Sequence, residues 1–444
     1  MIYNIFKTLL RVALRIFFRK LQTNNMDHIP QDKATIFVAN HQSAFMDALL
    51  IGTLLPQPLQ FISRGESFNT PIKRWFYGLF NMTPVYRKFA NPELMHKNEG
   101  LLETYQQLLL DNKSVMIFPE GISKIERRLY KIKTGAARII LGAAEAADYQ
   151  QEIVVIPVGL NYTNPHQFRS DVLINFGEPI PLAEYFEQHQ ENAWEAVTEL
   201  TARIKQEIKD LCFTIEDKKL DHLYDAIETL YEEELVTEAT MPEQGLPRVF
   251  KIKREVANAI HFFNQHEPKR VKQAKDRFQH FYDLMQKFQI QKTWLKTNAS
   301  TISTWALIKL VIGVPIYWYA LINNALVITI NKTLTDRVVY RPDFYGSILF
   351  IAGFFLFPLF YGLQIMAVGL LTHSFIWTII YANSLLTSSY FALRYQERLK
   401  IYRTQKSIQN LAAERNDMLN YLKRQRMLLL EMCREARGEY LAAG

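Results

Sequence analysis

Apolar residues in the first half of the chain occur in short runs, separated by longer stretches in which they recur at helical spacing. The runs predict strands, and they lie around residues 35–39, 59–63, 83–86, 115–118, 153–158 and 172–176. The stretches between them predict helices at 47–55, 94–111, 134–147 and 192–211. Because strands alternate with helices, we expect an α/β domain with a mixed, mainly parallel sheet, spanning residues 26–212. Pro157 favours an edge or strand-end position for its run.

Residues 1–25 have a different pattern, in which a cation recurs every four positions among apolar residues. Lys7, Arg11, Arg15 and Arg19 form one stripe, and the apolar residues fall on the other side. This pattern predicts an amphipathic helix that lies on a membrane surface, with its cations attracted to anionic lipid. A secretory signal would need an uninterrupted apolar core. A helix packed on the domain is the remaining alternative.

The second half of the chain begins with charge and continues with long apolar blocks. Residues 213–300 are charged and helical in period, which is typical of a connector with solvated helix faces. Residues 301–393 hold the two apolar blocks, and we expect this region to be embedded in a membrane. Residues 394–444 predict an amphipathic helical tail, either a short coiled coil or a helix docked on the connector. We favour the docked helix.

The two apolar blocks differ in how they suit a bilayer. The second, Ser347–Leu393, is too long for a single crossing and predicts a spanning hairpin with its tip at His373. The first contains Lys309 and Pro315, which suit a re-entrant or interfacial helix. Cations flank both blocks, so the positive-inside bias places these flanks in the cytoplasm. We therefore expect an inner or cytoplasmic membrane location, with the α/β domain on the cytoplasmic side.

Composition excludes several classes of site. The 444 residues carry a net charge of +8 and are long enough for two or three domains. Cys212 and Cys433 are the two cysteines, and they lie too far apart in sequence to indicate a disulfide framework or a thiolate metal site. No Cys/His cluster has zinc spacing, and there is no Walker loop or glycine-rich dinucleotide fingerprint. We expect no metal, no bound cofactor and no nucleic-acid partner.

The segment from Asn40 to Asp47 carries the clearest chemical signal. His41 stands where an apolar strand ends, and Asp47 stands at the start of an apolar helical stretch. A histidine at a strand end can face a cleft, and a nearby carboxylate can hold its ring and favour the imidazolium that forms after proton uptake. Such a pair can deprotonate an alcohol. The alternative is a structural histidine beside an aspartate that caps a helix.

Three further segments complete the pattern. Arg87 ends a short strand-like run that begins at Met82, Phe118-Pro119-Glu120-Gly121 follows a buried-type strand, and Ile153–Val158 is a further apolar strand with a proline. In this order and spacing, the segments resemble the glycerol-phosphate acyltransferase superfamily, which includes the lysophosphatidate acyltransferases. The resemblance covers roughly residues 30–180. It implies that His41 is the general base on the acceptor hydroxyl, that Asp47 orients it, and that the oxygen attacks an acyl thioester directly.

The resemblance also implies a set of substrate-binding residues. Arg87 would hold the acceptor phosphate, a task that suits a planar and permanently charged donor. Glu120, Gly121 and Ser123 would shape the acceptor site around the glycerol, and Lys133 would add positive charge near the phosphate. For Arg87 and Lys133, a solvated surface cation is the alternative.

Two features depart from the common family pattern. Five residues separate His41 from Asp47, whereas four are usual. In a continuous helix the extra residue would rotate the carboxylate by about 100°, so the pair can meet only if the turn before the helix absorbs it. This longer spacing occurs in some glycerol-phosphate acyltransferase relatives. The glycine often found upstream of the arginine is replaced around Asn81.

The sequence therefore predicts a membrane-bound acyltransferase that moves a fatty acyl group from acyl-CoA or acyl carrier protein, as a co-substrate, to a glycerol-phosphate acceptor. The acceptor is lysophosphatidate or glycerol 3-phosphate, and the sequence leaves both open. The other partners are membrane lipids. The alternative function is a non-catalytic lipid-binding or membrane-remodelling protein that retains the fold.

Overall fold

The computed structural model of the chain describes residues 2–65, 70–71, 74, 78, 81–85, 100–238, 243–288, 290, 294 and 304–443. The chain forms two compact units. Unit 1 comprises residues Met1–Glu216 together with Val339–Phe350, and unit 2 comprises Asp217–Val338 together with Ile351–Gly444. The short segment Val339–Phe350 thus packs with unit 1, although the rest of that unit ends at Glu216.

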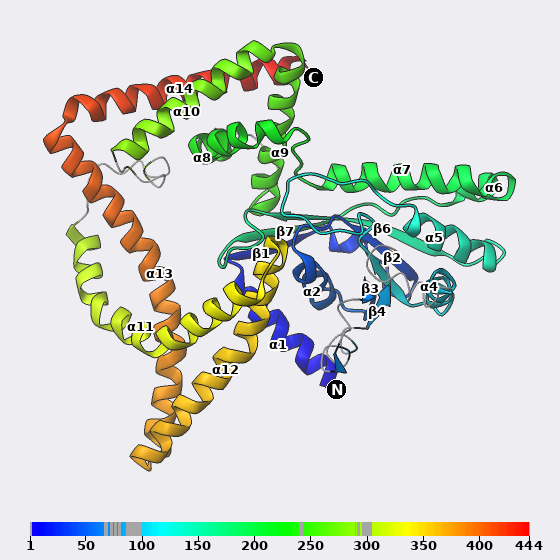
Figure 1. Cartoon of the computed structure of the whole chain (residues 1–444), viewed down its shortest axis with the longest axis horizontal. Helices are drawn as coiled ribbons and strands as arrows, with labels where there is room; N and C mark the ends of the chain where they lie inside the picture. The colour runs from blue at the N-terminus through cyan, green and yellow to red at the C-terminus, as the bar shows by residue number, and fades with distance from the viewer. Residues whose placement is uncertain are drawn as a thin grey trace. The chain divides into compact units, whose positions relative to one another are not determined.

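A mostly parallel sheet forms the centre of unit 1 (Figure 1). Its strand order is β1-β7-β6-β2-β5-β3-β4, and only β6 and β7 pair antiparallel. The strands are β1 (Lys20–Asn24), β2 (Ala34–Ala39), β3 (Leu59–Arg64), β4 (Met82–Val85), β5 (Ser114–Ile117), β6 (Ile153–Tyr162) and β7 (Asp171–Phe176). The mixed, mainly parallel sheet is as the sequence predicts. It also contains β1, which begins before the expected domain start at residue 26.

Strand β6 corrects one expectation. Pro157 lies in the middle of the sheet, because β6 pairs with β2 on one side and β7 on the other. The ladder with β7 begins only at Val158, and the carbonyl of Pro157 accepts from Gly177 N at 2.8 Å on that side. The proline nitrogen faces the same side, where no ladder bond is lost. The position is therefore compatible with a central strand.

Helices cover both sides of the sheet in unit 1, with α1 and α2 on the opposite side from α7 (Figure 1). The helices are α1 (Ile2–Phe17), α2 (Ala44–Leu54), α4 (Leu101–Leu110), α5 (Gly135–Ala146), α6 (Ala183–Glu191) and α7 (Ala193–Leu211). One face of the sheet packs Ile36, Val115 and Val155 against apolar residues of α4, α5 and α7. These buried contacts fix the strand ends on which the candidate site is built.

Helix α1 is amphipathic, but two of its cations point inward. Lys7 Nζ donates to Leu55 O at 2.5 Å, and Arg11 donates to Thr53 O at 2.6 and 3.0 Å. They cap carbonyls at the C-terminal end of α2, where positive charge is favoured. The expectation that these two cations face anionic lipid is therefore wrong. Burial, and next the charge of Arg11, lowers the pKa of Lys7.

An apolar stripe on α1 is exposed instead. The large side chains with more than half of their surface accessible are Ile5, Leu9, Val12 and Ile16. They recur every three or four residues, so they share one face of the helix. The inward face holds Leu10 and Leu14, which are buried. Helix α1 is thus packed on the unit along one side and presents an apolar side to its surroundings.

Unit 2 is helical throughout its described part. Its elements are α8 (Asp221–Glu238), α9 (Leu246–His266), α10 (Pro268–Lys287), α11 (Thr304–Val338), α12 (Tyr345–Thr372, whose first turns lie in unit 1), α13 (Phe375–Glu414) and α14 (Asn416–Ala443). Helix α14 packs against α8, α9 and α10, so the expected docking on the connector is confirmed for this part of the tail, whereas residues 394–414 continue α13. Helices α12 and α13 meet at His373, the expected hairpin tip.

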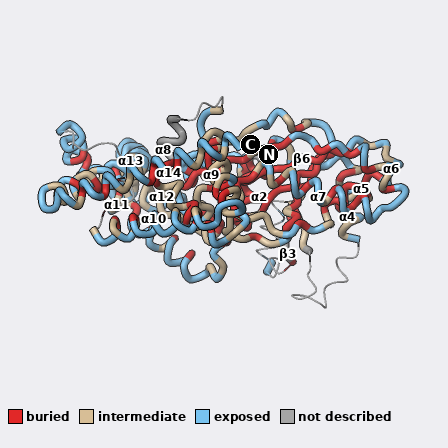
Figure 2. The backbone as a smooth tube through the Cα atoms, turned by 90° about the horizontal axis from the view of Figure 1, so that it is seen from above, coloured by how far each residue is buried: buried red, intermediate tan, exposed pale blue. Residues whose placement is uncertain are grey.

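Two described helical segments are long and apolar enough to cross a membrane, Thr304–Val338 and Pro342–Thr372. Little of either is buried, at 17% and 11% of the most apolar window. Figure 2 shows the contrast between these mostly exposed or half-buried helices and the buried strands of the sheet. Helix α11 continues through Pro315 as one curved element, which agrees with the kinking effect of an internal proline (Figure 1).

Candidate active site

The candidate site lies where parallel strands end. Strands β2, β5 and β6 are neighbours with the same direction, so their carboxyl ends meet at one edge of the sheet. His41 follows β2, Glu120 follows β5, and Tyr162 is the last residue of β6. Ligand sites of open α/β sheets form at this edge. The sheet topology therefore brings together residues that are far apart in sequence.

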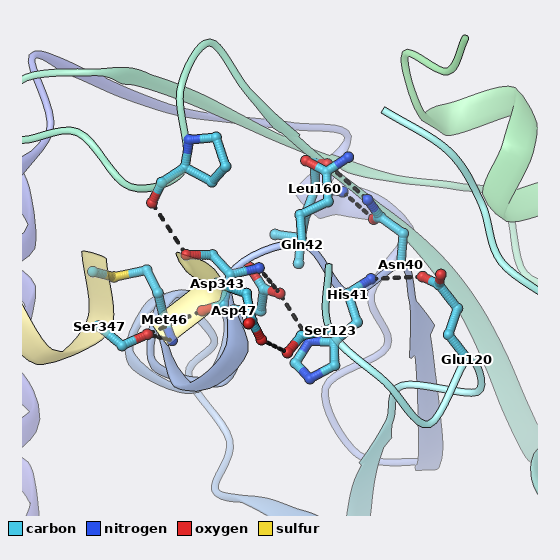
Figure 3. A network of polar contacts seen from close by, with 12 residues as sticks. Asn40, His41, Gln42, Met46, Asp47, Glu120, Ser123, Leu160, Asp343 and Ser347 are labelled. Carbon is cyan, nitrogen blue, oxygen red and sulfur yellow. Dashed lines mark hydrogen bonds and ion pairs between the residues drawn. The ribbon is translucent and has the colours of Figure 1, made fainter. Parts of the chain in front are cut away.

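His41 and Asp47 are in direct contact (Figure 3). The distance between His41 Nδ1 and Asp47 Oδ2 is 2.8 Å. The Asp47 side chain is fully buried, whereas 17% of the His41 side chain is accessible. The imidazole stacks on Phe118, with ring centroids 4.2 Å apart. The ring is therefore held on one face and at one nitrogen, and it retains access from outside.

Asp47 accepts hydrogen bonds from two further groups. Ser43 N donates to Oδ2 at 2.8 Å, and the Tyr162 hydroxyl donates to Oδ1 at 2.5 Å. Burial, reinforced by the neighbouring Asp47, raises the pKa of Tyr162 well above its ordinary value, so the hydroxyl remains a donor. An ionised carboxylate can only accept hydrogen bonds, so His41 Nδ1 must be the donor in its contact with Asp47. In the neutral ring the proton therefore sits on Nδ1, and Nε2 carries the free lone pair.

The turn before α2 accommodates the five-residue spacing. Ala44 is the first residue of α2 and has a φ of +41°, a region that residues with side chains rarely adopt. This unusual backbone conformation lies between His41 and Asp47, and Asp47 stands in the first turn of the helix. Such a conformation costs on the order of 1–3 kcal/mol and persists only where neighbouring contacts enforce it.

Glu120 joins the two loops that carry the site. Its Oε1 accepts from His41 N at 2.8 Å, and its Oε2 accepts from Tyr130 N at 2.9 Å. The side chain is buried, and burial raises the pKa of Glu120 to about 7, although the two N–H groups oppose this shift. Glu120 therefore links the backbone of His41 to the backbone of Tyr130 in the following loop.

The other residues predicted from the Phe-Pro-Glu-Gly turn lie beside it. Gly121 has a φ of +64°, and a Cβ there would lie 2.5 Å from Lys133 Nζ, so the lysine amine sits against the turn. Lys133 is otherwise exposed. Ser123 is buried, and its hydroxyl donates to Asp343 Oδ2. Arg87, the predicted phosphate ligand, lies outside the described residues.

Sequence reasoning missed three polar residues that the structure adds to this network, Tyr162, Asp343 and Ser347 (Figure 3 shows the last two). Tyr162 ends an apolar strand, and that position is a usable signal, because strand ends on this edge face the site. Asp343 lies between the apolar blocks and Ser347 begins the second block, where no local pattern connects them with the α/β domain.

Comparison with known proteins finds similarity to acyltransferases. Residues 20–161 match the family model described as Acyltransferase. Glycerol-3-phosphate O-acyltransferase 1 of Saccharomyces cerevisiae is 29% identical over 173 residues, 38% of this chain and 22% of that protein. A 1-acyl-sn-glycerol-3-phosphate acyltransferase of Chlamydomonas reinhardtii is 30% identical over 131 residues, 30% of this chain and 35% of that protein. The chain thus matches about a fifth to a third of the length of these relatives.

A solved structure is also similar. The 1-acyl-sn-glycerophosphate acyltransferase from Thermotoga maritima aligns with a TM-score of 0.32 and 22% identity, covering 47% of this chain and 78% of that one. The matched residues 20–161 include His41, Asp47 and the Phe118–Gly121 turn. Residues 20–161 are thus similar to an acyltransferase domain, and the relatives that share it are named as glycerol-3-phosphate and 1-acyl-sn-glycerol-3-phosphate acyltransferases.

Proposed function

We propose that this protein transfers a fatty acyl group from an acyl thioester to a hydroxyl of a glycerol-phosphate acceptor. The observation that carries the proposal is the 2.8 Å contact between His41 Nδ1 and the buried Asp47, within a segment that matches the Acyltransferase family model. The relatives are named for acylation of glycerol 3-phosphate and of 1-acyl-glycerol 3-phosphate. Both acceptors share a free hydroxyl and a phosphate. Acyl-CoA or acyl carrier protein supplies the thioester as a co-substrate.

The arrangement of the pair suggests the order of events. His41 Nε2 takes the proton from the acceptor hydroxyl, and the oxygen attacks the thioester carbonyl carbon. The C–S bond breaks, an ester forms, and the thiolate leaves and recovers the proton from the imidazolium. Asp47 stabilises that imidazolium in a buried setting, where the interaction between opposite charges is stronger than in water. No covalent acyl-enzyme is needed in this sequence.

A panel assay tests the proposal. Detergent-purified protein is incubated with labelled acyl-CoA or labelled acyl carrier protein and, separately, with glycerol 3-phosphate, lysophosphatidate, other lysophospholipids and dihydroxyacetone phosphate. We expect transfer to glycerol 3-phosphate or lysophosphatidate, and the rates identify the preferred acceptor and donor. Binding of lipid without transfer to any acceptor would instead support the non-catalytic, lipid-binding function.

Replacing Arg87 with alanine should raise the KM for the acceptor and leave the KM for the acyl donor unchanged. A lost charge-assisted hydrogen bond is worth roughly 1.5–3 kcal/mol, or about 10- to 150-fold in affinity. Steady-state kinetics with each substrate varied in turn measure both constants. Equal effects on the two substrates, or no effect, would contradict phosphate binding by Arg87 and favour a role in the fold or binding by Lys133.

We further propose that the protein is bound to a membrane, with the active site facing the cytoplasm. The support is the exposed apolar stripe of α1 and the low burial of α11 and α12. Carbonate should leave the full-length protein in the membrane fraction, whereas a chain ending at Lys296 should be extracted, because a surface helix is held less tightly than an embedded one. Release of the full-length protein by carbonate would show that the apolar helices are not embedded.

A further inference from the structure

The connection between the two apolar helices α11 and α12 is part of unit 1. Val339–Phe350 joins the compact unit that contains the sheet, although it lies more than a hundred residues beyond the unit's main segment. Two of its polar residues are deeply buried there, Asp343 with 5% and Ser347 with 0% of their surface accessible. Buried polar groups require partners. Both find them in the candidate active site.

Asp343 and Arg341 hold the loop that comes after the Phe-Pro-Glu-Gly turn. The Ser123 hydroxyl donates to Asp343 Oδ2, and Arg341 Nη2 donates to the Ser123 carbonyl oxygen at 3.1 Å. Arg341 also binds the same carboxylate, with Nη2 2.8 Å from Oδ2 and Nε 3.1 Å from Oδ1. The bidentate contact fixes Arg341 and Asp343 relative to one another. This ion pair thus holds Ser123 both at its hydroxyl and at its backbone carbonyl.

Ser347 spans the strained turn at the start of α2. Its hydroxyl donates to Ser43 O at 3.0 Å and accepts from Met46 N at 2.9 Å. Ala44, with its positive φ, lies between these two residues, and Asp47 comes directly after them. Asp47 in turn accepts from Ser43 N. The serine therefore fixes both sides of the turn that sets the carboxylate against His41 (Figure 3).

Close packing keeps Ser347 in this place. At Gly346 a Cβ would lie 2.6 Å from the carbonyl oxygen of Pro165, so the backbone approaches that loop as only glycine allows. The Ser43 hydroxyl donates to the same Pro165 oxygen at 3.1 Å. Phe350 packs edge-on against Phe17 of α1, with ring centroids 5.5 Å apart. The segment is therefore anchored at several points, and a strained turn needs such enforcement.

We propose that Ser347 is a positioning residue for catalysis: through the Ser43–Met46 turn, it holds Asp47 in the geometry that orients His41. The inference rests on the proposed acyl transfer by the His41–Asp47 pair. It implies that the residues matched to the family do not make a complete site by themselves. The missing support comes from the connection between α11 and α12 and from the first turns of α12, which contain Ser347.

The test is Ser347→Ala in the full-length protein. The expected result is a kcat lower by roughly 10- to 100-fold, with the KM values of donor and acceptor unchanged, because the turn relaxes while the substrate contacts remain. Ser170→Ala is the matched control. Ser170 is also buried in unit 1, and its hydroxyl has no hydrogen-bond partner in the described part of the chain, so we expect unchanged kinetics.

A double-mutant cycle distinguishes positioning from general destabilisation. If Ser347 acts through Asp47, the change Ser347→Ala should lower kcat much less in an Asp47→Asn protein than in the wild type. Equal losses in the two backgrounds would overturn the proposal. So would wild-type kinetics of Ser347→Ala while the wild type is active. A wild type that transfers no acyl group would overturn the proposed function and this inference with it.

Asp343→Asn provides a second variant if Ser347→Ala fails to accumulate as folded protein. It removes one charge from the ion pair and leaves Ser347 in place. We expect the KM for the acceptor to rise several-fold and the KM for the donor to stay constant, because Ser123 lies in the predicted acceptor site. Unchanged kinetics in this variant would contradict the role of the segment in supporting the site.

Discussion

Replacing His41 with alanine should lower the rate of acyl transfer by roughly 10²- to 10⁴-fold or more, the usual contribution of a general base. A methyl group cannot accept the hydroxyl proton. The loss should appear in kcat and in kcat/KM alike, because the proton is transferred only in the transition state. Initial rates with the best acceptor of the panel measure it, and melting curves in detergent report whether the fold is intact.

His189→Ala is the matched control for this change. His189 is also a buried histidine of unit 1, and it bonds to Tyr149 at 2.8 Å, far in sequence from the candidate site. We expect its activity per folded molecule to equal that of the wild type. Wild-type rates in His41→Ala would remove the catalytic assignment, whatever the stability of the protein.

Asp47→Asn should also impair transfer, by about 10- to 10²-fold, which is less than the loss of the base itself. The carboxylate accepts from three donors, His41 Nδ1, Ser43 N and the Tyr162 hydroxyl. An amide offers one acceptor oxygen and turns an NH₂ group toward one of these donors, so the ring loses part of its support and the imidazolium loses its counter-charge. The imidazole remains, and residual activity with it.

The control for Asp47→Asn is Asp171→Asn. Asp171 is a second buried aspartate of unit 1, at the start of β7, and its two carboxylate oxygens accept from Arg19 Nε and Nη2. Its backbone pairs with Thr163, next to the end of β6, but its carboxylate binds Arg19 and not His41. The substitution removes the same charge, and we expect it to affect stability while leaving the rate per folded molecule unchanged. If the two variants lose activity equally, Asp47 has no special role at His41.

Local patterns were sufficient to predict the strands that carry the site. The runs that became β2 and β5 are continuous and apolar because both faces of a central parallel strand are buried, and the polar residues after them mark the edge where ligands bind. Strand β1 was missed because its sequence, Lys-Leu-Gln-Thr-Asn, has no apolar run. It is a mostly half-buried strand at the edge of the sheet. Its place is set by pairing with β7 and not by an apolar pattern of its own.

Long-range contacts explain the rest of what the sequence did not predict. The basic stripe of α1 has the composition of a lipid-facing surface, and only the tertiary structure shows that Lys7 and Arg11 meet the carbonyl end of α2. Ser347 and Asp343 lie 304 and 220 positions from the residues that they bind, Ser43 and Ser123. Periodicity and capping rules act over a few residues, so they carry no information about such pairs.

The attachment of Val339–Phe350 to the active site also restricts how the chain can thread a bilayer. Residues 217–303 have no apolar run of the ~20 residues that a crossing takes, so α11 begins on the face where unit 1 lies. It ends on that face too, because Ser347 is bonded to the turn that carries Asp47. The number of crossings between these two points must therefore be even.

The number of membrane crossings made by helices α12 and α13 together must also be even. Helix α14 packs against α8, α9 and α10, so in the proposed membrane arrangement the chain after α13 returns to the face on which those three helices lie. Helix α11 has 35 residues and is about 52 Å long at ~1.5 Å per residue, shorter than the roughly 60 Å that two crossings of a ~30 Å core require. If the protein is bound to a membrane as proposed, α11 therefore enters it without a complete crossing, and α12 and α13 cross as a pair or not at all.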